Sequence, residues 1–229
     1  MPSLVVHYAL VGLLAATLLG AAFDRRSLLV SLAVVTIPDV DAFIALFSTA
    51  GHRTATTNLV IPAVAAAVLA VDLYVREESF VRERWGAYGI RVAWFCVFVY
   101  AVAHVLLDAV GGGANLLWPL HDQFYQIRGR LELSTQRGIV QTFVETSPPS
   151  SGGDGGGGGG GVPTLRSIGN TSEVQMSTGI DPNPGAEEQP EVVDRVFPVA
   201  RGGWQLYLLI VGTLATAARF VVGHDLPEE

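Results

Sequence analysis

The chain contains no lysine. All 14 basic residues are arginine, 21 acidic residues outnumber them, and the formal net charge is −7 at pH 7. Such a composition leaves no basic patch for nucleic acid, so we expect no nucleic-acid partner. An acidic, lysine-free chain resembles the proteins of halophilic archaea, although a GC-rich genome produces the same bias.

The chain also has only one cysteine and no basic residue before its first apolar run. The single Cys96 lies in an apolar stretch, which excludes a disulfide within one chain and fits a small buried hydrophobe. No basic residue precedes the first apolar run, and that run contains His7 near its start. We therefore expect the run to be a retained helix rather than a removable signal peptide.

Hydrophobic residues make up 50% of the chain. They concentrate in five runs that approach the roughly 20 residues needed to cross a ~30 Å hydrocarbon layer. The predicted helices cover residues 4–23, 28–47, 59–75, 90–110 and 204–222. The sequence thus predicts an all-α, polytopic membrane protein with about five transmembrane helices surrounded by lipid.

Composition divides the chain into four parts. Residues 1–120 form a predicted four-helix membrane core, and residues 121–146 a short β-like cap outside the cytoplasm, with strand-like runs at 124–127, 130–133 and 139–145. Residues 147–191 are rich in Gly, Ser and Pro and include seven consecutive glycines, so we expect a disordered linker. Residues 192–229 contain the last transmembrane helix and an acidic tail.

Arginines in the short loops predict the orientation. Arg25 and Arg26 lie between the first two helices, and four more arginines lie between the third and fourth: Arg76, Arg82, Arg84 and Arg91. The positive-inside rule makes both loops cytoplasmic, which places the N-terminus outside and the C-terminus in the cytoplasm. The long fourth loop contains six arginines, but loops of that length cross the membrane largely regardless of charge.

Five ionisable residues lie inside apolar runs, where they are costly and normally functional: His7, Asp39, Asp41, His104 and Asp108. His52 joins them in a polar turn, and the predicted topology brings all six to the outer leaflet. His104 and Asp108 are spaced i, i+4 and share a helix face, so both can reach one cation. Alternatively, the two side chains form a hydrogen-bonded pair without contacting a metal.

Asp39 and Asp41 follow Pro38, which interrupts a regular helix. A local turn would let both carboxylates point inward, where a divalent cation would relieve their repulsion. The alternative is a helix that ends at the proline with both acids in solvent.

His52 and Arg53 lie in the polar turn 51–58. We interpret His52 as a metal ligand and Arg53 as a binder of a substrate oxygen, because its planar fork suits phosphate and carboxylate. The alternative is a solvated loop without a site. His121, near an interfacial Trp-Pro pair, is left out of the ligand set.

Several short motifs together resemble the membrane-bound metal-dependent hydrolases of the YdjM type. They lie within the first 120 residues: His7 followed by Gly12, Pro38-Asp39-Val40-Asp41, His52-Arg53, His104-Val-Leu-Leu-Asp108 running to Gly113, and Leu117-Trp118-Pro119-Leu120. The resemblance implies a helical membrane protein that holds a metal through matching His and Asp positions. The loop departs from the family pattern HRGxTHS, since Thr56, Thr57 and Asn58 stand at its end and the family histidine is replaced by Thr57.

The leading hypothesis is a metal-dependent hydrolase that activates water near the outer leaflet, acting on a small molecule or a lipid such as a phosphoester. The predicted metal ligands are a subset of the six ionisable residues, and Asp41 and Arg53 have predicted catalytic roles. Zinc is the first choice of metal, with manganese or iron as alternatives. Two other functions use the same residue types: a transporter or proton relay, and a non-catalytic metal-binding membrane module.

Overall fold

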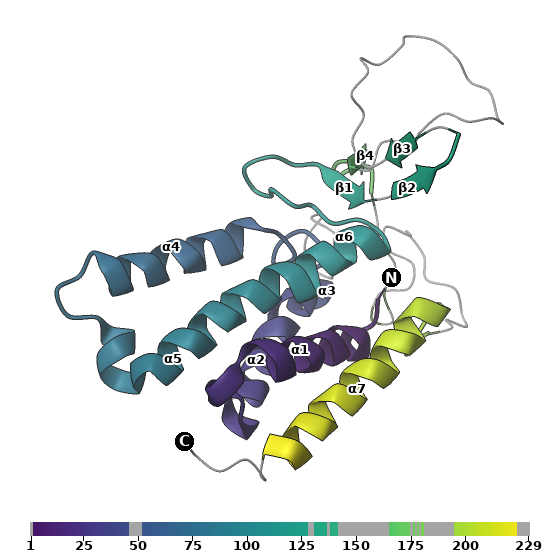
Figure 1. Ribbon diagram of the computed structural model, residues 1–229. Helices are drawn as coiled ribbons and strands as arrows, with labels where there is room; N and C mark the ends of the chain where they lie inside the picture. The colour runs from purple at the N-terminus through teal and green to yellow at the C-terminus, as the bar shows by residue number, and fades with distance from the viewer. Residues whose placement is uncertain are drawn as a thin grey trace.

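We describe the protein from a computed structural model, which describes residues 2–45, 52–127, 131–136, 138–141, 165–174, 176, 178, 180 and 195–223. Its helical elements are α1 (Leu4–Leu18), η1 (Gly20–Ala22), α2 (Arg25–Thr36), η2 (Ile37–Val40), α3 (Asp41–Ile44), α4 (Val60–Tyr74), α5 (Phe80–Val99), η3 (Tyr100–Leu106), α6 (Leu107–Gly111) and α7 (Gly203–Gly223). The short strands are β1 (Phe124–Ile127), β2 (Leu131–Ser134), β3 (Gly138–Gln141) and β4 (Leu165–Gly169). Figure 1 shows a helical bundle with the strands beyond α6 at one end.

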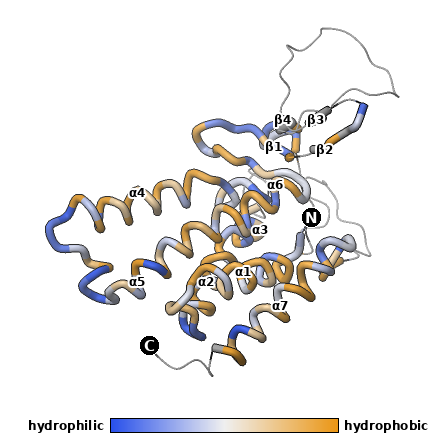
Figure 2. Tube along the Cα trace, in the orientation of Figure 1, coloured by the Kyte–Doolittle hydropathy of each residue, from blue (hydrophilic) through white to orange (hydrophobic). Residues whose placement is uncertain are grey.

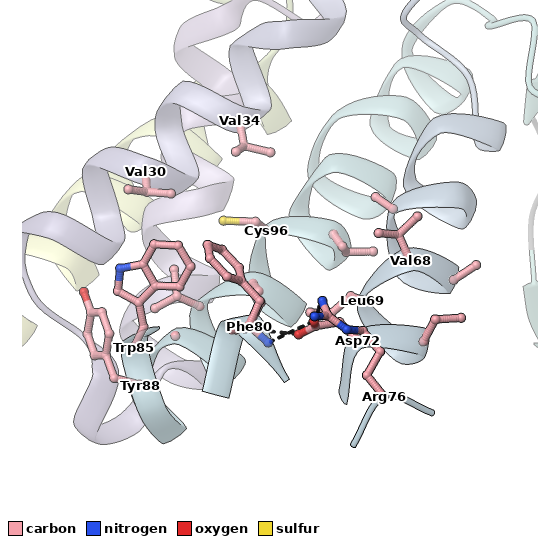
Figure 3. A pocket seen from close by; sticks show the side chains of 18 of the residues that line it. Val30, Val34, Val68, Leu69, Asp72, Arg76, Phe80, Trp85, Tyr88 and Cys96 are labelled. Atoms are coloured by element: carbon pink, nitrogen blue, oxygen red, sulfur yellow. Dashed lines mark hydrogen bonds and ion pairs between the residues drawn. The ribbon is translucent and has the colours of Figure 1, made fainter. Parts of the chain in front are cut away.

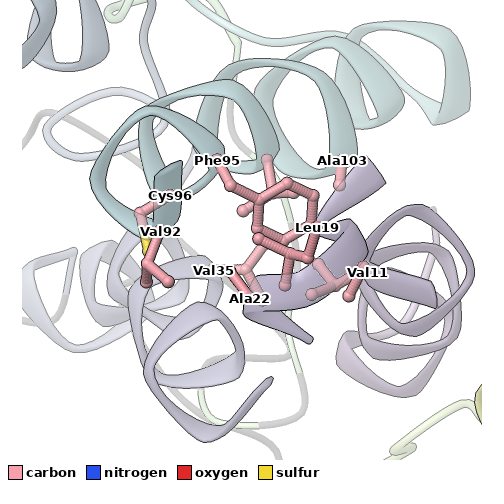
Figure 4. Packing of buried hydrophobic residues seen from close by; sticks show 10 residues of the cluster. Val11, Leu19, Ala22, Val35, Val92, Phe95, Cys96 and Ala103 are labelled. Carbon is pink, nitrogen blue, oxygen red and sulfur yellow. The ribbon is translucent and has the colours of Figure 1, made fainter. Parts of the chain in front are cut away.

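The main apolar core lies between α1, α2 and α5 (Figure 4). Its buried side chains include Val11 of α1, Leu19 just after α1, Val35 of α2, and Phe95 and Val99 of α5. α4 packs on α5, and α7 packs on α1 at the far side of the bundle. The packed core therefore joins α1, α2 and α5, while α4 and α7 cover it from two sides.

Local signals explain where two helices begin and end. Asp24 and Ser27 form a capping box at the start of α2, each side chain bonded to the other's backbone N–H. α1 ends earlier than the predicted 4–23, at Leu18, because Gly20 adopts φ 54° and turns the chain. The predicted first helix is therefore divided into α1 and the one-turn helix η1.

α5 begins ten residues before the predicted 90–110. Ser79 caps it by accepting a hydrogen bond from the Arg82 backbone, and Asp72 of α4 accepts the N–H groups of Phe80 and Val81. The charged residues after Phe80 have the composition of a loop, which is why the hydrophobic pattern did not include this first part of the helix. Gly86, at φ 60°, marks a kink within it.

The second apolar run contains the interruption that its proline predicted. The chain leaves the α-helical pattern after Thr36, makes a 3₁₀ turn through Pro38, and resumes as α3 at Asp41. The fourth run contains a π-helical segment, η3, between α5 and α6. Such wide turns are common at functional sites, and this one includes His104.

The β region differs from the sequence expectation. β2 pairs with β3 in an antiparallel hairpin, as the two runs suggested, but β1 pairs antiparallel with β4. β4 lies inside the stretch 147–191 for which we expected no ordered structure, since its composition gave no strand signal. The seven consecutive glycines and the acidic tail lie outside the described residues.

Three helical segments of the described chain are long and apolar enough to cross a membrane: Arg25–Ile44, Phe80–Gly111 and Gly203–Val222. α1 and α4 are apolar but shorter. Many exposed positions on the helices are large and hydrophobic, among them Val68, Leu214 and Val221, and Figure 2 shows the apolar colour along their outer faces. These features indicate a helical membrane protein.

Candidate metal centre

Two buried histidines from different helices lie against each other. The rings of His7 (α1) and His104 (η3) are stacked, with centroids 4.1 Å apart and planes 7° apart. His7 Nδ1 lies 2.7 Å from the Ala103 carbonyl, and His104 Nδ1 lies 2.7 Å from the Val35 carbonyl. Because a carbonyl only accepts, each Nδ1 carries the proton. A ring that carries no second proton then presents the lone pair of Nε2, the arrangement typical of metal-ligating histidines.

Both Nε2 atoms point at the carboxylate of Asp108. His7 Nε2 lies 3.4 Å from Asp108 Oδ1, and His104 Nε2 lies 3.4 Å from Asp108 Oδ2. One ligand atom from each of the three residues lies within 4.8 Å of the others. His104 Nε2 is buried and has no hydrogen-bond partner among the described residues. Lone pairs that face a carboxylate repel it, so this group needs a shared proton or a bound cation.

Asp39 lies at the edge of the same group. Its Oδ1 atom is 3.6 Å from His104 Nε2, and its side chain is 32% exposed, whereas those of His7, His104 and Asp108 are almost fully buried. The η2 turn after Pro38 places Asp39 there. A cation at the three buried residues would therefore have a fourth ligand within reach, the Asp39 carboxylate, on the side that opens toward solvent.

The Arg53 guanidinium binds Asp108 through both its carboxylate and its backbone carbonyl. Its Nη2 donates to Asp108 Oδ1 at 2.6 Å, and its Nη1 donates to the backbone carbonyls of Asp108 and Gly113 at 3.1 and 2.9 Å. The side chain is buried, and in the part of the chain that the structure describes its Nε has no hydrogen-bond partner. Arg53 also adopts φ 71°, a conformation that costs a non-glycine residue free energy and is found mostly where surrounding contacts enforce it.

Asp41 anchors the polar turn. Its Oδ1 accepts from His52 Nδ1 at 2.6 Å, and its Oδ2 accepts from the backbone N–H of Arg53 at 2.9 Å, the N–H of Thr54 at 3.2 Å and the hydroxyl of Thr57 at 2.7 Å. Four donors thus surround a carboxylate that is 1% exposed. This is a dense set of charge-assisted hydrogen bonds, which fixes the turn and orients His52.

The structure therefore separates the six predicted ligands into two groups. His7, His104 and Asp108 converge, with Asp39 beside them, while His52 and Asp41 pair with each other. The predicted i, i+4 contact between His104 and Asp108 is present. The Thr57 hydroxyl donates to Asp41 Oδ2 at 2.7 Å and, more weakly at 3.3 Å, to the Pro38 carbonyl.

Three contacts at this site could not be foreseen from side-chain types. Two are the backbone carbonyls of Ala103 and Val35, which fix the histidine tautomers. The third is the Arg53–Asp108 ion pair, since the sequence suggested a substrate oxygen as the partner of Arg53. The signal in the sequence was an arginine in a short turn between apolar runs, in a chain whose apolar runs contain acids that need a positive partner.

A cavity of about 740 Å³ opens beside the group. Asp39, His52, Arg53 and Asp108 line its polar part. Its remaining walls are mostly apolar and come from α1, from η2 and α3, and from the segment before α7: Val5, Val40, Phe43, Val196, Phe197 and Val199. Arg201 adds a positive charge to the lining. The site is therefore connected to a hollow that combines charge with hydrocarbon.

The chain was compared with models of protein families, with curated proteins and with solved structures, and none of them matches it.

Proposed function

We propose that the protein is a membrane-embedded, metal-dependent hydrolase of the YdjM type. The observation that carries the proposal is the convergence of two Nε2 lone pairs and one carboxylate, all buried, at a site adjoining a cavity. His7, His104 and Asp108 would hold a divalent cation, with Asp39 as an additional carboxylate. A bound cation would supply Lewis-acid chemistry, lowering the pKa of water toward about 7.

Zinc suits this donor set best, and manganese or iron are alternatives. Imidazole nitrogen together with carboxylate oxygen is a common zinc environment, and a site with three protein ligands leaves a position for water or substrate. The donors do not exclude the other two metals.

The pair of His52 and Asp41 has the arrangement of a general base. Asp41 holds the Nδ1–H of His52 at 2.6 Å, so the free Nε2 is available to accept a proton. His52 lines the cavity beside Asp39 and Asp108. In this proposal His52 takes the proton of the attacking water, and Asp41 acts through His52 rather than on substrate.

Charge and shape favour an anionic, amphiphilic substrate such as a lipid phosphoester. Asp39 and Asp108 carry two negative charges against one positive charge on Arg53, so a divalent cation would leave the site positive. The apolar cavity walls suit an acyl or isoprenoid chain, and Arg201 suits a phosphate. Arg53 contributes positive charge next to Asp108 and a buried Nε without a partner.

We place this site in the outer leaflet. Tyr88 near the α4–α5 loop donates to Asp24 beside the α1–α2 turn at 3.1 Å, so the two arginine-rich loops lie at one end of the bundle. The chain from the kink at Gly86 to Asp108 runs to the opposite end, which is a rise of about 33 Å. With both loops cytoplasmic, five helices cross the membrane, the N-terminus lies outside, and the C-terminus lies in the cytoplasm.

The first test is metal content. Full-length protein purified in detergent is analysed by mass spectrometry of bound metals, for the wild type and an Asp39→Ala, His104→Ala double variant, with His121→Ala as the control because His121 is exposed outside the site. We expect a stoichiometric metal in the wild type and the control, and its loss in the double variant. A wild type that neither contains metal nor acquires it on titration contradicts the proposal.

The second test is turnover. Lipid phosphoesters presented in mixed micelles are assayed for phosphate release by the metal-loaded protein, and His52→Gln should abolish release while keeping the metal. A non-catalytic metal-binding module remains the second candidate, because the Arg53–Asp108 ion pair compensates the carboxylate charge without any substrate. That function predicts that chelation lowers thermal stability while no ester class is hydrolysed.

A further inference from the structure

A second hollow lies at the other end of the bundle, far from the candidate metal centre. It has a volume of about 1230 Å³ and is bounded by α2, α4 and α5. α2 and α4 both pack on α5 but are not themselves a closely packed pair, which leaves this space between them. We call it the α2–α4–α5 groove, and Figure 3 shows the side chains that line it.

The walls of the groove are apolar over most of its length. Val30 and Val34 of α2 face Val68 and Leu69 of α4, with Cys96 of α5 between them (Figure 3). Val30 and Val68 are 48% and 65% exposed, so these side chains have no protein partner that covers them. The lining extends along α5 from Trp85 to Val97, about 18 Å of helix, which matches the ~15 Å depth of one leaflet.

The end of the groove next to the arginine-rich loops is polar and cationic. Arg26, in the first turn of α2, and Arg76, after α4, line it, as do Trp85 and Tyr88, which are residue types typical of the membrane interface. Arg76 also bonds Asp72 at 2.9 Å, but Asp72 is shared with Ser79 and two backbone N–H groups. Within the described residues, Arg26 forms no ion pair with a carboxylate, and the residue is exposed.

We propose that the groove holds one acyl chain of an anionic phospholipid from the surrounding bilayer, with the lipid phosphate at Arg26 and Arg76. Hydrocarbon is the solvent that such walls meet in a membrane, and a second protein helix would not account for two arginines at one end. Arginine forks suit phosphate, and the cytoplasmic leaflet contains the anionic lipids. This assignment rests on the proposed orientation, in which the arginine-rich loops are cytoplasmic, but it does not depend on hydrolysis.

Trp85 provides the probe, because it lines the groove. Trp94, Trp118 and Trp204 are replaced by phenylalanine, and the full chain is reconstituted in vesicles of phosphatidylcholine and phosphatidylglycerol at equal mole fractions. Brominated acyl chains, which quench tryptophan on contact, are placed on one lipid at a time. We expect brominated phosphatidylglycerol to quench Trp85 more strongly, with an association preference of about fivefold per arginine in contact with phosphate.

Matched variants separate the groove from general surface charge. Arg26→Gln with Arg76→Gln should remove the preference, whereas Arg25→Gln with Arg82→Gln, which alters arginines of the same loops outside the groove lining, should keep it. Val34→Phe with Val68→Phe should reduce quenching by both lipids because it fills the groove. Helical content measured by circular dichroism in the same vesicles serves as the control for folding of each variant.

Three results would overturn the proposal. Equal quenching by the two brominated lipids would show that the groove does not select an anionic headgroup. Loss of the preference in both arginine pairs would assign the effect to surface charge alone. An absence of quenching by either lipid would show that a second copy of the chain or another protein fills the groove.

Discussion

The imidazoles of His7 and His104 stack with their centroids 4.1 Å apart, and each ring's Nδ1 is bonded to a backbone carbonyl of a neighbouring helical segment. Both Nε2 atoms consequently face one carboxylate, that of Asp108. If both rings were protonated, two cations would be stacked in a buried site. One divalent cation satisfies both lone pairs and the carboxylate together, while leaving both rings neutral.

The two histidines should therefore contribute to metal binding together. We expect His7→Ala and His104→Ala each to lower metal affinity by a factor of 10 or more, since loss of even an outer partner of a metal ligand typically costs about 10–100-fold. Isothermal titration of metal into chelator-treated protein measures this effect. His121→Ala should bind as the wild type does, and an unaltered affinity in either single variant would remove that histidine from the ligand set.

Asp41 should act on the turn rather than on the metal. Asp41→Asn replaces one of the two oxygens that four donors share, so the variant should lose about 1.5–3 kcal/mol of stability, the usual worth of a hydrogen bond to a charged group. Thermal unfolding in detergent should show a lower midpoint, while metal stoichiometry stays at the wild-type value.

Asp39→Asn provides the matched comparison for Asp41→Asn. Asp39 is partly exposed and its Oδ1 atom lies 3.6 Å from His104 Nε2, so its variant should weaken metal binding and change the unfolding midpoint little. If Asp41→Asn lost the metal while Asp39→Asn kept it, the two roles would be reversed.

Much of the helical layout could be predicted because hydrophobic runs and membrane thickness determine it. Pro38 predicted the break in the second helix, and the i, i+4 spacing predicted the contact of His104 with Asp108. The start of α5 at Phe80 was missed, since its first turns contain Arg and Glu and are held by Asp72 from another helix. Hydrophobic periodicity contains no information about such a tertiary cap.

The candidate site was predicted as a list of residues but not as a geometry. Burial and charge identified all six ionisable positions, yet only the structure separates His52 and Asp41 from the other four. The division depends on the left-handed conformation of Arg53, which turns its backbone N–H toward Asp41 and its side chain toward Asp108. No local sequence signal specifies that conformation, because glycine and asparagine are the residues that usually adopt it.

Arg53 should compete with the metal for Asp108. Arg53→Met removes the guanidinium and leaves a buried carboxylate without its partner, which typically costs about 3–5 kcal/mol. In chelator we expect a much lower unfolding midpoint than in the wild type. Added metal should restore part of the lost stability, because a cation then neutralises Asp108. This stabilisation grows with the ratio of the metal concentration to the dissociation constant.

The comparison with wild type decides this prediction. The rise in midpoint on adding metal should be larger for Arg53→Met than for the wild type, and Arg82→Gln, an exposed change elsewhere, should behave as the wild type. A smaller metal-dependent rise in Arg53→Met would show that Arg53 supports metal binding instead of competing with it.

The contact between the loop after α6 and the turn after β4 should depend on pH. Burial raises the pKa of Asp122, but hydrogen bonds from Thr171 and Asn115 outweigh it and hold that pKa below its ordinary value of about 3.9. The stabilisation is therefore fully present above that ordinary value and is lost as the pH falls through the lowered one. We expect the Thr171 amide to remain protected from hydrogen exchange between pH 5 and 7 and to lose protection only below about pH 4.

Asp122→Asn tests the source of this pH dependence. The amide still accepts one hydrogen bond but cannot ionise, so protection of Thr171 should be lower at pH 6 and should no longer change with acidification. If the variant kept the wild-type profile, a group other than Asp122 would be responsible.

The closest helix packing in the bundle, between α1 and α7, should tolerate no side chain at Gly212. A Cβ atom there would overlap the backbone carbonyl of Ala9, and one at Gly12 would overlap the Thr216 hydroxyl, so the two helices meet through small residues as helices in membranes commonly do. Gly212→Ala should therefore destabilise the protein by about 1–3 kcal/mol, the usual cost of overpacking, despite the better helix propensity of alanine.

Gly203→Ala is the matched control, because a Cβ at Gly203 meets no atom of the described residues within 4 Å. Thermal unfolding in detergent should show a lower midpoint for Gly212→Ala and an equal or higher one for Gly203→Ala, and equal midpoints for the two variants would mean that α7 does not rest on α1 at this glycine.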